Sequence, residues 1–487
     1  MDRKTLTGFI LIGAILLLWP SYSELISPSE KNPENPVLPD TTIVEKYSKK
    51  DQGVPKKTEG VQRNTESKTL TVDGGSYVAK INNIAGGSIV SFDLKKHLKS
   101  SEESLNLIDN QNSKNLVVSF INQSGEIVVL DELWSIVSGG SAVLSEENSA
   151  SSMVFETSYM GKPITKKLTF YYNSYEVDVH VSLREIKESS LDEKYVLSWV
   201  GGLPEHEGSQ DAMFMESLVS QAGSIESFRV GAAGFFGSSN TKNIDEESKK
   251  YVGLVDFAGY RTKYFGVFFV PEKSDIVEVY KYPSTNRAGV DINISQGINL
   301  EKNKLYLGPL DYSNVEALGV GLEEKILGWQ WLSSVSWLVY SIMILLYGLI
   351  PNYGVVVVLF AILIKLVTYP LMAKQLRSSK KMQEISPLMN NIKTKYKNNP
   401  TLQQQKIASL FQENKINPLA GCLPLLIQMP VLMSVFMVFR NTIEFRGESF
   451  LLWINDLSSA DTLLFVGDIP INVLPFLMSL SMYYTMK

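Results

Sequence analysis

The spacing of hydrophobic positions divides this 487-residue chain into two parts near residue 320. Before that point, short runs alternate apolar and polar residues and are separated by glycine and asparagine, as at 77–81, 88–92 and 175–180. A period of two with turn residues between the runs predicts antiparallel strands. We therefore expect residues 69–318 to form one large β-sandwich.

After residue 320 the apolar runs become long enough to cross a bilayer, which takes about 20 residues. Three such runs, at 351–371, 416–440 and 469–487, predict transmembrane helices. The sequence as a whole thus predicts a mixed fold. It joins a periplasmic antiparallel β-sandwich to an α-helical transmembrane core with a cytoplasmic helical hairpin.

The N-terminal run, residues 1–26, is a further apolar stretch that follows Arg3 and Lys4. We interpret it as an uncleaved anchor, because no pair of small residues marks a cleavage site, although a signal peptide is the alternative. Basic residues before the run place the N-terminus in the cytoplasm by the positive-inside rule. Residues 27–68 are rich in proline and charge and are expected to form a disordered linker on the far side.

Residues 319–350 concentrate aromatic side chains in an apolar segment. Trp329, Trp331, Trp337 and Tyr340 are among them, and such rings prefer the level of the lipid headgroups. The segment therefore predicts an amphipathic helix that lies on the outer surface of the membrane that the chain spans. A plain transmembrane span is the alternative.

Local charge supports this topology. The segment 372–415 holds nine basic and two acidic residues, a net charge of +7, which predicts a cytoplasmic position. Its helical periodicity on both sides of residues 398–400 indicates a hairpin, which would bind anionic lipids and would also suit ribosomal RNA or a nascent chain. The loop 441–468 has five acidic residues and one arginine and belongs outside. The basic residues assigned to the cytoplasmic loop are Lys374, Arg377, Lys380, Lys381, Lys393, Lys395 and Lys397.

The composition excludes several classes of function. A net charge of −5 and a pI near 5.6 argue against DNA as a partner. The sequence contains no metal-ligand spacing and no nucleophile motif, so we expect no catalytic residue, no metal and no cofactor, and the chain is not expected to be an enzyme. A sugar-binding or mutarotase-like sandwich stays open, because such folds use isolated His and Glu residues. Cys422 is the single cysteine, which excludes an intrachain disulfide.

Two polar residues lie inside the apolar runs. Lys365 is well within the run at 351–371, where a charge costs about 2.5–3.5 kcal/mol and usually faces a bundle interior or a hydrated cavity. The alternative is that its side chain extends to the cytoplasmic surface. Gln428 lies in the next run, followed by a stripe of methionines that either packs or contacts varied apolar partners. The stripe consists of Met429, Met433 and Met437.

Residues 415–430, Lys-Ile-Asn-Pro-Leu-Ala-Gly-Cys-Leu-Pro-Leu-Leu-Ile-Gln-Met-Pro, resemble the signature of YidC/Oxa-type membrane protein insertases. Tyr-Pro-Leu at 369–371 and Leu-Trp-Ile-Asn-Asp-Leu at 452–457 support the resemblance. It extends over nearly the whole chain and includes the large periplasmic domain of the Gram-negative form. Family members carry two more spans, so the chain is expected to stop before the last two.

The resemblance implies a hydrophilic intramembrane groove that takes hydrophobic segments of nascent proteins into the inner membrane. Lys365 occupies the position of a groove arginine; it keeps the charge but lacks the planar fork of donors. Gln428 matches a groove-lining glutamine, and Met429, Met433 and Met437 would line the path of the substrate. The implied partners are nascent membrane proteins, the ribosome, the Sec translocon and anionic lipids.

Two other classes of function are compatible with the residue pattern. One is a membrane-anchored periplasmic protein that binds or modifies sugars through residues 69–318. The other is a channel or transporter subunit, in which Lys365 would be an ion site. The insertase hypothesis accounts for the basic loop, the lysine and the signature together.

Overall fold

The computed structural model describes residues 66–98, 104–108, 114–229, 248–281, 290–414, 423–466 and 469–486. These residues belong to one compact unit, Thr58–Lys487. The anchor predicted at 1–26 and nearly all of the linker predicted at 27–68 lie outside the described residues, as does Cys422.

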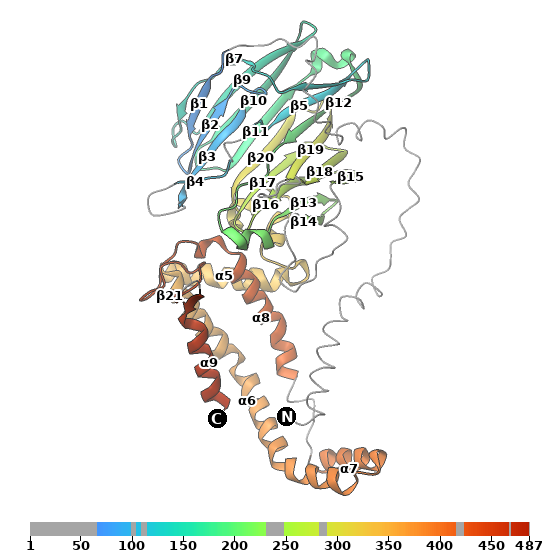
Figure 1. Ribbon diagram of the computed structural model, residues 1–487, viewed down its shortest axis with the longest axis vertical. Coiled ribbons are helices and arrows are strands. Elements are labelled where there is room, and N and C mark those ends of the chain that lie inside the picture. The colour runs from blue at the N-terminus through green and yellow to red at the C-terminus, as the bar shows by residue number, and fades with distance from the viewer. Residues whose placement is uncertain are drawn as a thin grey trace. The chain divides into compact units, whose positions relative to one another are not determined.

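The sheet-rich domain predicted from the alternating pattern is confirmed (Figure 1). Its described strands form three sheets, in which every pair is antiparallel except β1 with β8. In spatial order, the five-stranded sheet is β4 (Ser104–Asn106), β3 (Ser88–Leu98), β2 (Tyr77–Asn82), β1 (Thr69–Asp73) and β8 (Ala142–Val143). The nine-stranded sheet is β14 (Ser224–Arg229), β13 (Glu216–Gln221), β16 (Phe257–Arg261), β17 (Phe265–Pro271), β20 (Lys302–Pro309), β11 (Glu176–Ser182), β10 (Lys162–Tyr171), β9 (Ala150–Tyr159) and β7 (Ser135–Ser138). The six-stranded sheet is β15 (Ser248–Val252), β18 (Ile276–Lys281), β19 (Val290–Gly297), β12 (Ser190–Trp199), β5 (Val117–Asn122) and β6 (Ile127–Leu130).

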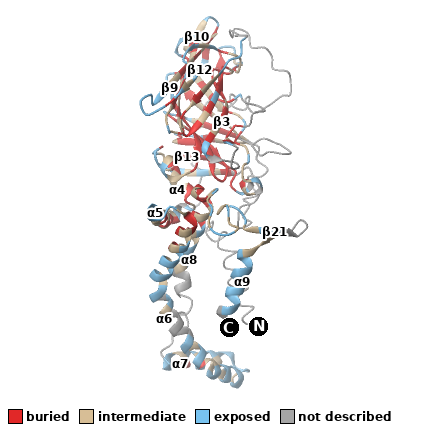
Figure 2. Ribbon diagram, turned by 90° about the vertical axis from the view of Figure 1, so that its left-hand side faces the viewer, coloured by how far each residue is buried: buried red, intermediate tan, exposed pale blue. Residues whose placement is uncertain are grey.

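The core of this domain lies between the sheets. Along β9 and β11, buried residues alternate with partly exposed ones, as expected when one face of a strand packs and the other meets water. Large aromatic side chains, among them Trp134, Phe155 and Trp199, are fully or almost fully buried. Figure 2 shows the buried residues gathered in this domain, whereas much of the helical part is exposed. Apolar burial, at about 25 cal/mol per Å², therefore carries the stability of the domain.

Short helices interrupt the strands of the sheet domain, and both short and long helices follow it. Two of these 3₁₀ segments, η1 (Arg184–Ser189) and η2 (Gly208–Met213), lie inside the sheet domain. The helical part then begins. Its elements are α3 (Tyr312–Glu316), α4 (Leu322–Ile326), η4 (Gln330–Leu332), α5 (Ser333–Leu349), α6 (Tyr353–Lys395), α7 (Pro400–Glu413), α8 (Leu423–Asn441), η6 (Ile443–Phe445) and α9 (Val473–Met486).

Helix α6 is continuous over 43 residues and contains both an apolar and a basic half. The Asn352 side chain caps it by accepting the Val355 N–H at 3.0 Å. The segment Tyr353–Pro370 is the one helix in the described part of the chain that is long and apolar enough to cross a membrane. At 1.5 Å per residue, α6 extends about 65 Å, roughly twice the hydrocarbon thickness of a bilayer.

The break predicted near Asn398 separates α6 from α7. Asn399 caps α7 by accepting the Leu402 N–H at 3.1 Å, and Pro400 occupies the first helical position, where a missing N–H costs nothing. The two helices meet through Ile385 and Leu410, with Met382, Met389 and Phe411 packed around them. The amide of Gln403 also donates to the Lys393 carbonyl at 2.8 Å, so the two segments form a packed hairpin.

The C-terminal run predicted as one helix over 469–487 contains two kinds of structure. Ile469–Asn472 forms β22, which pairs antiparallel with β21 (Thr462–Val466), and α9 begins only at Val473. The Asp461 carboxylate accepts the Leu474 N–H at 2.5 Å and so holds the first turn of α9. Short apolar runs fit a strand or a helix equally well, and here the neighbouring strand decides.

Candidate functional site

The apolar half of α6 packs through one face and leaves the others exposed. Tyr353, Val356 and Phe360 are buried in a cluster with residues of α5 and α8, and Val357 and Ile364 lie beside them. These positions recur at helical spacing and form one stripe. Only 22% of the residues of Tyr353–Pro370 are buried, which distinguishes this segment from the core helix of a soluble protein.

Lys365 lies on an exposed face of α6, next in sequence to the stripe residue Ile364. It is five residues from Pro370, a distance of about 8 Å along the helix axis. Among the residues that the structure describes, none accepts a hydrogen bond from its ammonium group. The lysine therefore presents its charge outward and is not neutralised within the described helices.

Helix α8 carries the other polar candidate and the methionines. Gln428 is half-buried, Met429 is 47% exposed, Met433 is half-buried, and Met437 is buried. A methyl group built on Gly328 would lie 2.9 Å from the Cβ of Met437, so this end of the stripe packs directly against the chain before α5. The stripe thus changes from an exposed to a packed surface along the helix.

Lys365 and Gln428 lie on different helices, α6 and α8, that share the cluster with α5. In the described part of the chain no hydrogen bond joins the two side chains. Ser336 of α5 and Ser434 of α8 are fully buried, and small side chains at such positions let helices approach closely. The helices that carry the two candidates are therefore held together by packing.

The basic candidates extend along α6 and into the connection to α7. Lys374 and Arg377 are positions of α6. Lys380, Lys381 and Lys393 of the same helix have exposed side chains. Lys395 and Lys397 are exposed as well, and the Lys395 ammonium lies 5.8 Å from the centroid of the Tyr396 ring. The hairpin thus presents a solvated basic surface.

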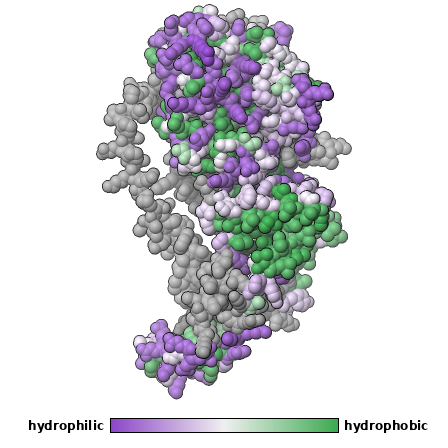
Figure 3. Space-filling view, turned by 180° about the vertical axis from the view of Figure 1, so that it is seen from behind, coloured by the Kyte–Doolittle hydropathy of each residue, from purple (hydrophilic) through white to green (hydrophobic). Residues whose placement is uncertain are grey.

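The aromatic residues near α5 divide into two groups. Trp329, Trp331 and Trp337 are exposed, and the rings of the first two stack with centroids 6.1 Å apart. Tyr340 and Tyr347 point inward instead: the Tyr340 hydroxyl donates to Glu444 at 2.7 Å, and the Tyr347 ring stacks 4.1 Å from that of Tyr353. Figure 3 shows that apolar residues gather into one surface area in the helical part of the chain.

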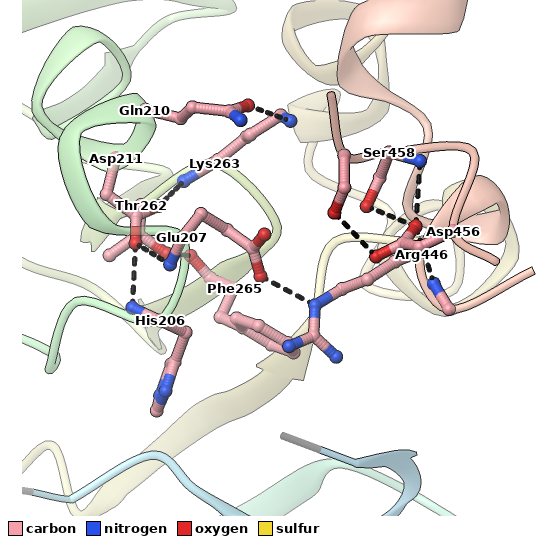
Figure 4. A network of polar contacts seen from close by, with 12 residues as sticks. His206, Glu207, Gln210, Asp211, Thr262, Lys263, Phe265, Arg446, Asp456 and Ser458 are labelled. Carbon is pink, nitrogen blue, oxygen red and sulfur yellow. Dashed lines mark hydrogen bonds and ion pairs between the residues drawn. The ribbon is translucent and has the colours of Figure 1, made fainter. Parts of the chain in front are cut away.

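Sequence reasoning missed a set of charged contacts between the sheet domain and the loop after α8. The Arg446 Nε donates to Glu207 Oε1 at 2.6 Å, and both side chains are almost buried (Figure 4). The one available signal was that Arg446 is the single basic residue of an acidic loop.

No group of three or more His, Cys, Asp or Glu side chains in the described part of the chain is arranged to hold a metal ion. The polar contacts that the described helices do make are hydrogen bonds and ion pairs between protein groups.

Two protein-family models match this chain. The one described as YidC periplasmic domain matches residues 69–340, and the one described as 60Kd inner membrane protein matches residues 345–487. The boundary between them falls inside α5, where the sheet domain has already given way to helices.

Several curated proteins are similar over the full chain. The protein named membrane protein insertase YidC from Prosthecochloris aestuarii is 31% identical over 521 residues, which cover 100% of this chain and 86% of that protein. The protein of the same name from Chlorobaculum parvum is 29% identical over 524 residues, with the same two shares covered.

Solved structures are similar to about half of this chain at much lower identity. A galactose mutarotase related enzyme from Lactobacillus acidophilus is 10% identical with a TM-score of 0.29, covering 49% of this chain and 97% of that one. An alpha-galactosidase from Geobacillus stearothermophilus is 10% identical with a TM-score of 0.30, covering 52% and 42%.

Proposed function

Because the chain belongs to the YidC family of membrane protein insertases, we propose that Lys365 and Gln428 line the path by which it inserts nascent membrane proteins. This membership confirms the resemblance seen in residues 415–430, and insertion of proteins into the inner membrane is the function of the family. Insertion makes and breaks no covalent bond, so its physical task is to lower the free-energy barrier for a polar flank.

The exposed charge of Lys365 is the observation that carries this proposal. A lysine in an apolar segment whose ammonium group donates no hydrogen bond to a described residue is costly in lipid. Its cost falls if the face that it occupies is hydrated, and its charge then attracts the acidic flank of a substrate segment. Extension of the side chain to the membrane surface remains the competing explanation, because Pro370 is only about 8 Å away.

The half-exposed residues of α8 suit the apolar side of the same path. Gln428 offers an amide that can both accept and donate hydrogen bonds, and Met429 and Met433 are flexible side chains that adapt to varied apolar surfaces. Met437, being packed against Gly328, would mark the outer end of this path.

The surrounding elements complete a topology in this proposal. The basic hairpin of α6 and α7 lies in the cytoplasm, where it contacts anionic lipids and the ribosome, and the Sec translocon is a further partner. The segment around α5 lies on the outer surface, which is supported by the exposed Trp329, Trp331 and Trp337. The sheet domain is then periplasmic.

A photo-crosslinking residue at Gln428 tests the path. Membranes that contain this variant are mixed with ribosomes stalled on a short, single-span nascent chain with an acidic flank. We expect a crosslink once the apolar segment has emerged. We expect it to weaken about tenfold in Lys365→Glu, because a hydrogen bond to a charged group contributes about 1.5–3 kcal/mol. Lys365→Arg should retain it.

Two controls make the result specific. The same crosslinker at the exposed sheet residue Val129 should capture no nascent chain. Lys397→Glu, which reverses a charge of the hairpin, should lower ribosome association and leave the crosslink formed by bound ribosomes unchanged. A crosslink at Gln428 of equal strength in Lys365→Glu would contradict the role of the lysine, and its absence from the parent protein would contradict the path.

A further inference from the structure

The chain just after α8 contacts the sheet domain through an almost buried ion pair. Arg446 and Glu207 meet at 2.6 Å, with side-chain exposures of 9% and 13%. The guanidinium carbon of Arg446 also lies 5.6 Å from the centroid of the Phe265 ring, within the range of a cation–π contact. Arg446 thus interacts at once with a carboxylate and an aromatic ring of the sheet domain.

Contacts within the sheet domain hold Glu207 in position independently of Arg446. The buried Asp211 carboxylate accepts the N–H groups of His206 and Glu207, each at 2.8 Å, and the N–H of Lys263 at 3.0 Å (Figure 4). The Lys263 ammonium donates to Gln210 at 2.7 Å, which ties η2 to the turn between β16 and β17. Hydrogen bonds to the charged form of a buried carboxylate make such a loop rigid.

The loop that carries Arg446 has a matching anchor in Asp456. Its carboxylate accepts the N–H groups of Gly447 and Ser458, at 3.0 and 2.8 Å, and the hydroxyls of Ser458 and Ser459. Burial by itself would raise the pKa of Asp456, but these hydrogen bonds outweigh it and lower the pKa. Asp456 therefore stays ionised and fixes the loop from its own side.

Helix α8 meets the same part of the sheet domain at its outer end. The guanidinium carbon of Arg440 lies 4.5 Å from the centroid of the Phe214 ring, directly after η2. The Asn441 amide donates to the Ile326 carbonyl at 2.9 Å, which joins α8 to α4. The contacts of the sheet domain therefore extend from Arg446 in the loop to Arg440 on the helix that carries Gln428.

Charge makes this contact selective. The loop 441–468 contains five acidic residues, which Glu207 and Asp211 repel, and Arg446 is its single cation. Opposite charges brought together among like charges fix the register of an interface more than its strength. Arg446 can satisfy Glu207 in one arrangement of the two parts only.

We propose that η2 and its neighbours form a dock that sets the position of the outer end of α8 relative to the sheet domain. The dock consists of Glu207, Asp211, Phe214, Lys263 and Phe265, and it receives Arg440 and Arg446. The sheet domain thereby positions the helix that bears the candidate substrate path. This inference concerns the domain rather than the path, and it stands whether or not Gln428 contacts substrate.

A distance measurement between spin labels tests the dock in the full chain. Labels are placed at Val252→Cys on β15 and Leu451→Cys in the loop, both exposed, in a Cys422→Ser background that has no other thiol. The parent protein should give one narrow distance distribution. Glu207→Gln or Arg446→Gln should each at least double its width, because each removes one partner of an almost buried ion pair.

The double variant separates a paired contact from two unrelated ones. Glu207→Gln with Arg446→Gln removes both charges, so its distribution should be no wider than that of either single variant. Widths that add in the double variant would overturn the pairing, and unchanged widths in the single variants would overturn the dock.

Two further variants keep the result clear. Arg446→Lys lies outside the sheet domain and keeps the charge while losing the planar fork, so it should widen the distribution less than Arg446→Gln does. Lys304→Gln breaks the exposed ion pair of Lys304 with Glu176 and should leave the width unchanged. Equal widening in the Lys304 variant would show a general loss of structure and contradict the specific dock.

Discussion

The sheet domain and the helices after it use the same kinds of side chain in opposite ways. In the sheet domain, large apolar residues such as Trp134, Phe155 and Trp199 are buried to 1% exposure or less. In α5, α6 and α9, apolar residues such as Leu345, Val367 and Phe476 are about two-thirds exposed. The helical cluster is also much smaller than the core of the sheet domain.

The difference is the one expected when the sheet domain folds in water and the helices lie in lipid. Exposed leucines over whole helices would aggregate in water, whereas in lipid they meet an environment as apolar as themselves. A buried core is then unnecessary, and helices need only a narrow packed stripe to stay together. Exposure therefore predicts different consequences of a substitution in the two parts.

A charge placed on an exposed apolar position of each part should give the largest difference between them. Leu363 of α6 and Val129 of β6 are 36% and 39% exposed, nearly the same fraction. We expect Leu363→Asp to cost about 3 kcal/mol in membrane integration, because Asp lies near the centre of an apolar segment, on the face away from Lys365. Val129→Asp, at a sheet edge in water, should cost almost nothing.

Extraction of membranes at alkaline pH measures this effect, with the amount of correctly integrated protein as the readout. If Leu363→Asp integrates as well as Val129→Asp does, the exposed face of α6 does not meet lipid.

Replacing a glycine by valine should also affect the stability of the two parts differently, by a smaller amount. A methyl group built on Gly259 of β16 would lie 2.1 Å from the Phe268 ring and 2.4 Å from the Val267 carbonyl, whereas one built on Gly348 of α5 would meet nothing within 4 Å. Gly259→Val should therefore destabilise the sheet domain by about 2 kcal/mol or more. Gly348→Val should be neutral, and denaturant unfolding followed by tryptophan fluorescence compares the two.

Retained stability in Gly259→Val would mean that the ring of Phe268 moves aside, and the close pairing of β16 with β17 would then be softer than these contacts indicate.

A titration of Lys166 distinguishes the dry sheet core by how the free energy of unfolding changes with each unit of pH. Lys166 is fully buried, and its ammonium donates to the Leu116 carbonyl at 2.6 Å and to the Ala85 carbonyl. Burial lowers the pKa of Lys166 to about 7 from its ordinary value of 10.5. Between these two values the unfolded chain binds a proton that the folded domain does not bind. The free energy of unfolding therefore rises with pH across this window, by up to about 1.4 kcal/mol per unit.

Lys166→Met should remove this rise, and Lys167→Met, which replaces the exposed neighbour, should retain it. Denaturant unfolding at several pH values between 7 and 10 measures the slope. Identical slopes in the two variants would contradict the dry environment of Lys166.

The sequence predicts the strands of the sheet domain but not their partners. Alternation identifies the strand that begins near Val177, because its period of two is local. Its pairing with β20, which sets Val177 opposite Leu305, joins residues far apart in the chain and leaves no periodic signal. The strand β22 was missed for the same reason, since only β21 determines its conformation.

The candidate path has a local signal in the sequence, and the dock has almost none. Lys365 and Gln428 can be found from sequence because a polar residue inside an apolar run is locally anomalous. Glu207 and Arg446 are charged residues in polar surroundings, separated by 239 positions, and resemble ordinary surface charges until folding brings them together. Their burial is a property of the tertiary structure alone.

Pro370 interrupts the hydrogen bonding of α6. Proline has no N–H to donate to the carbonyl of Leu366, four residues earlier, and the Thr368 hydroxyl donates to the Ile364 carbonyl at 2.8 Å in the same turn. The backbone of α6 therefore lacks one hydrogen bond between the half that packs on α5 and α8 and the half that bears the basic hairpin. The half of α6 that bears the hairpin can therefore bend at this turn, while Tyr353, Val356 and Phe360 stay packed and Lys365 stays on the exposed face of the other half.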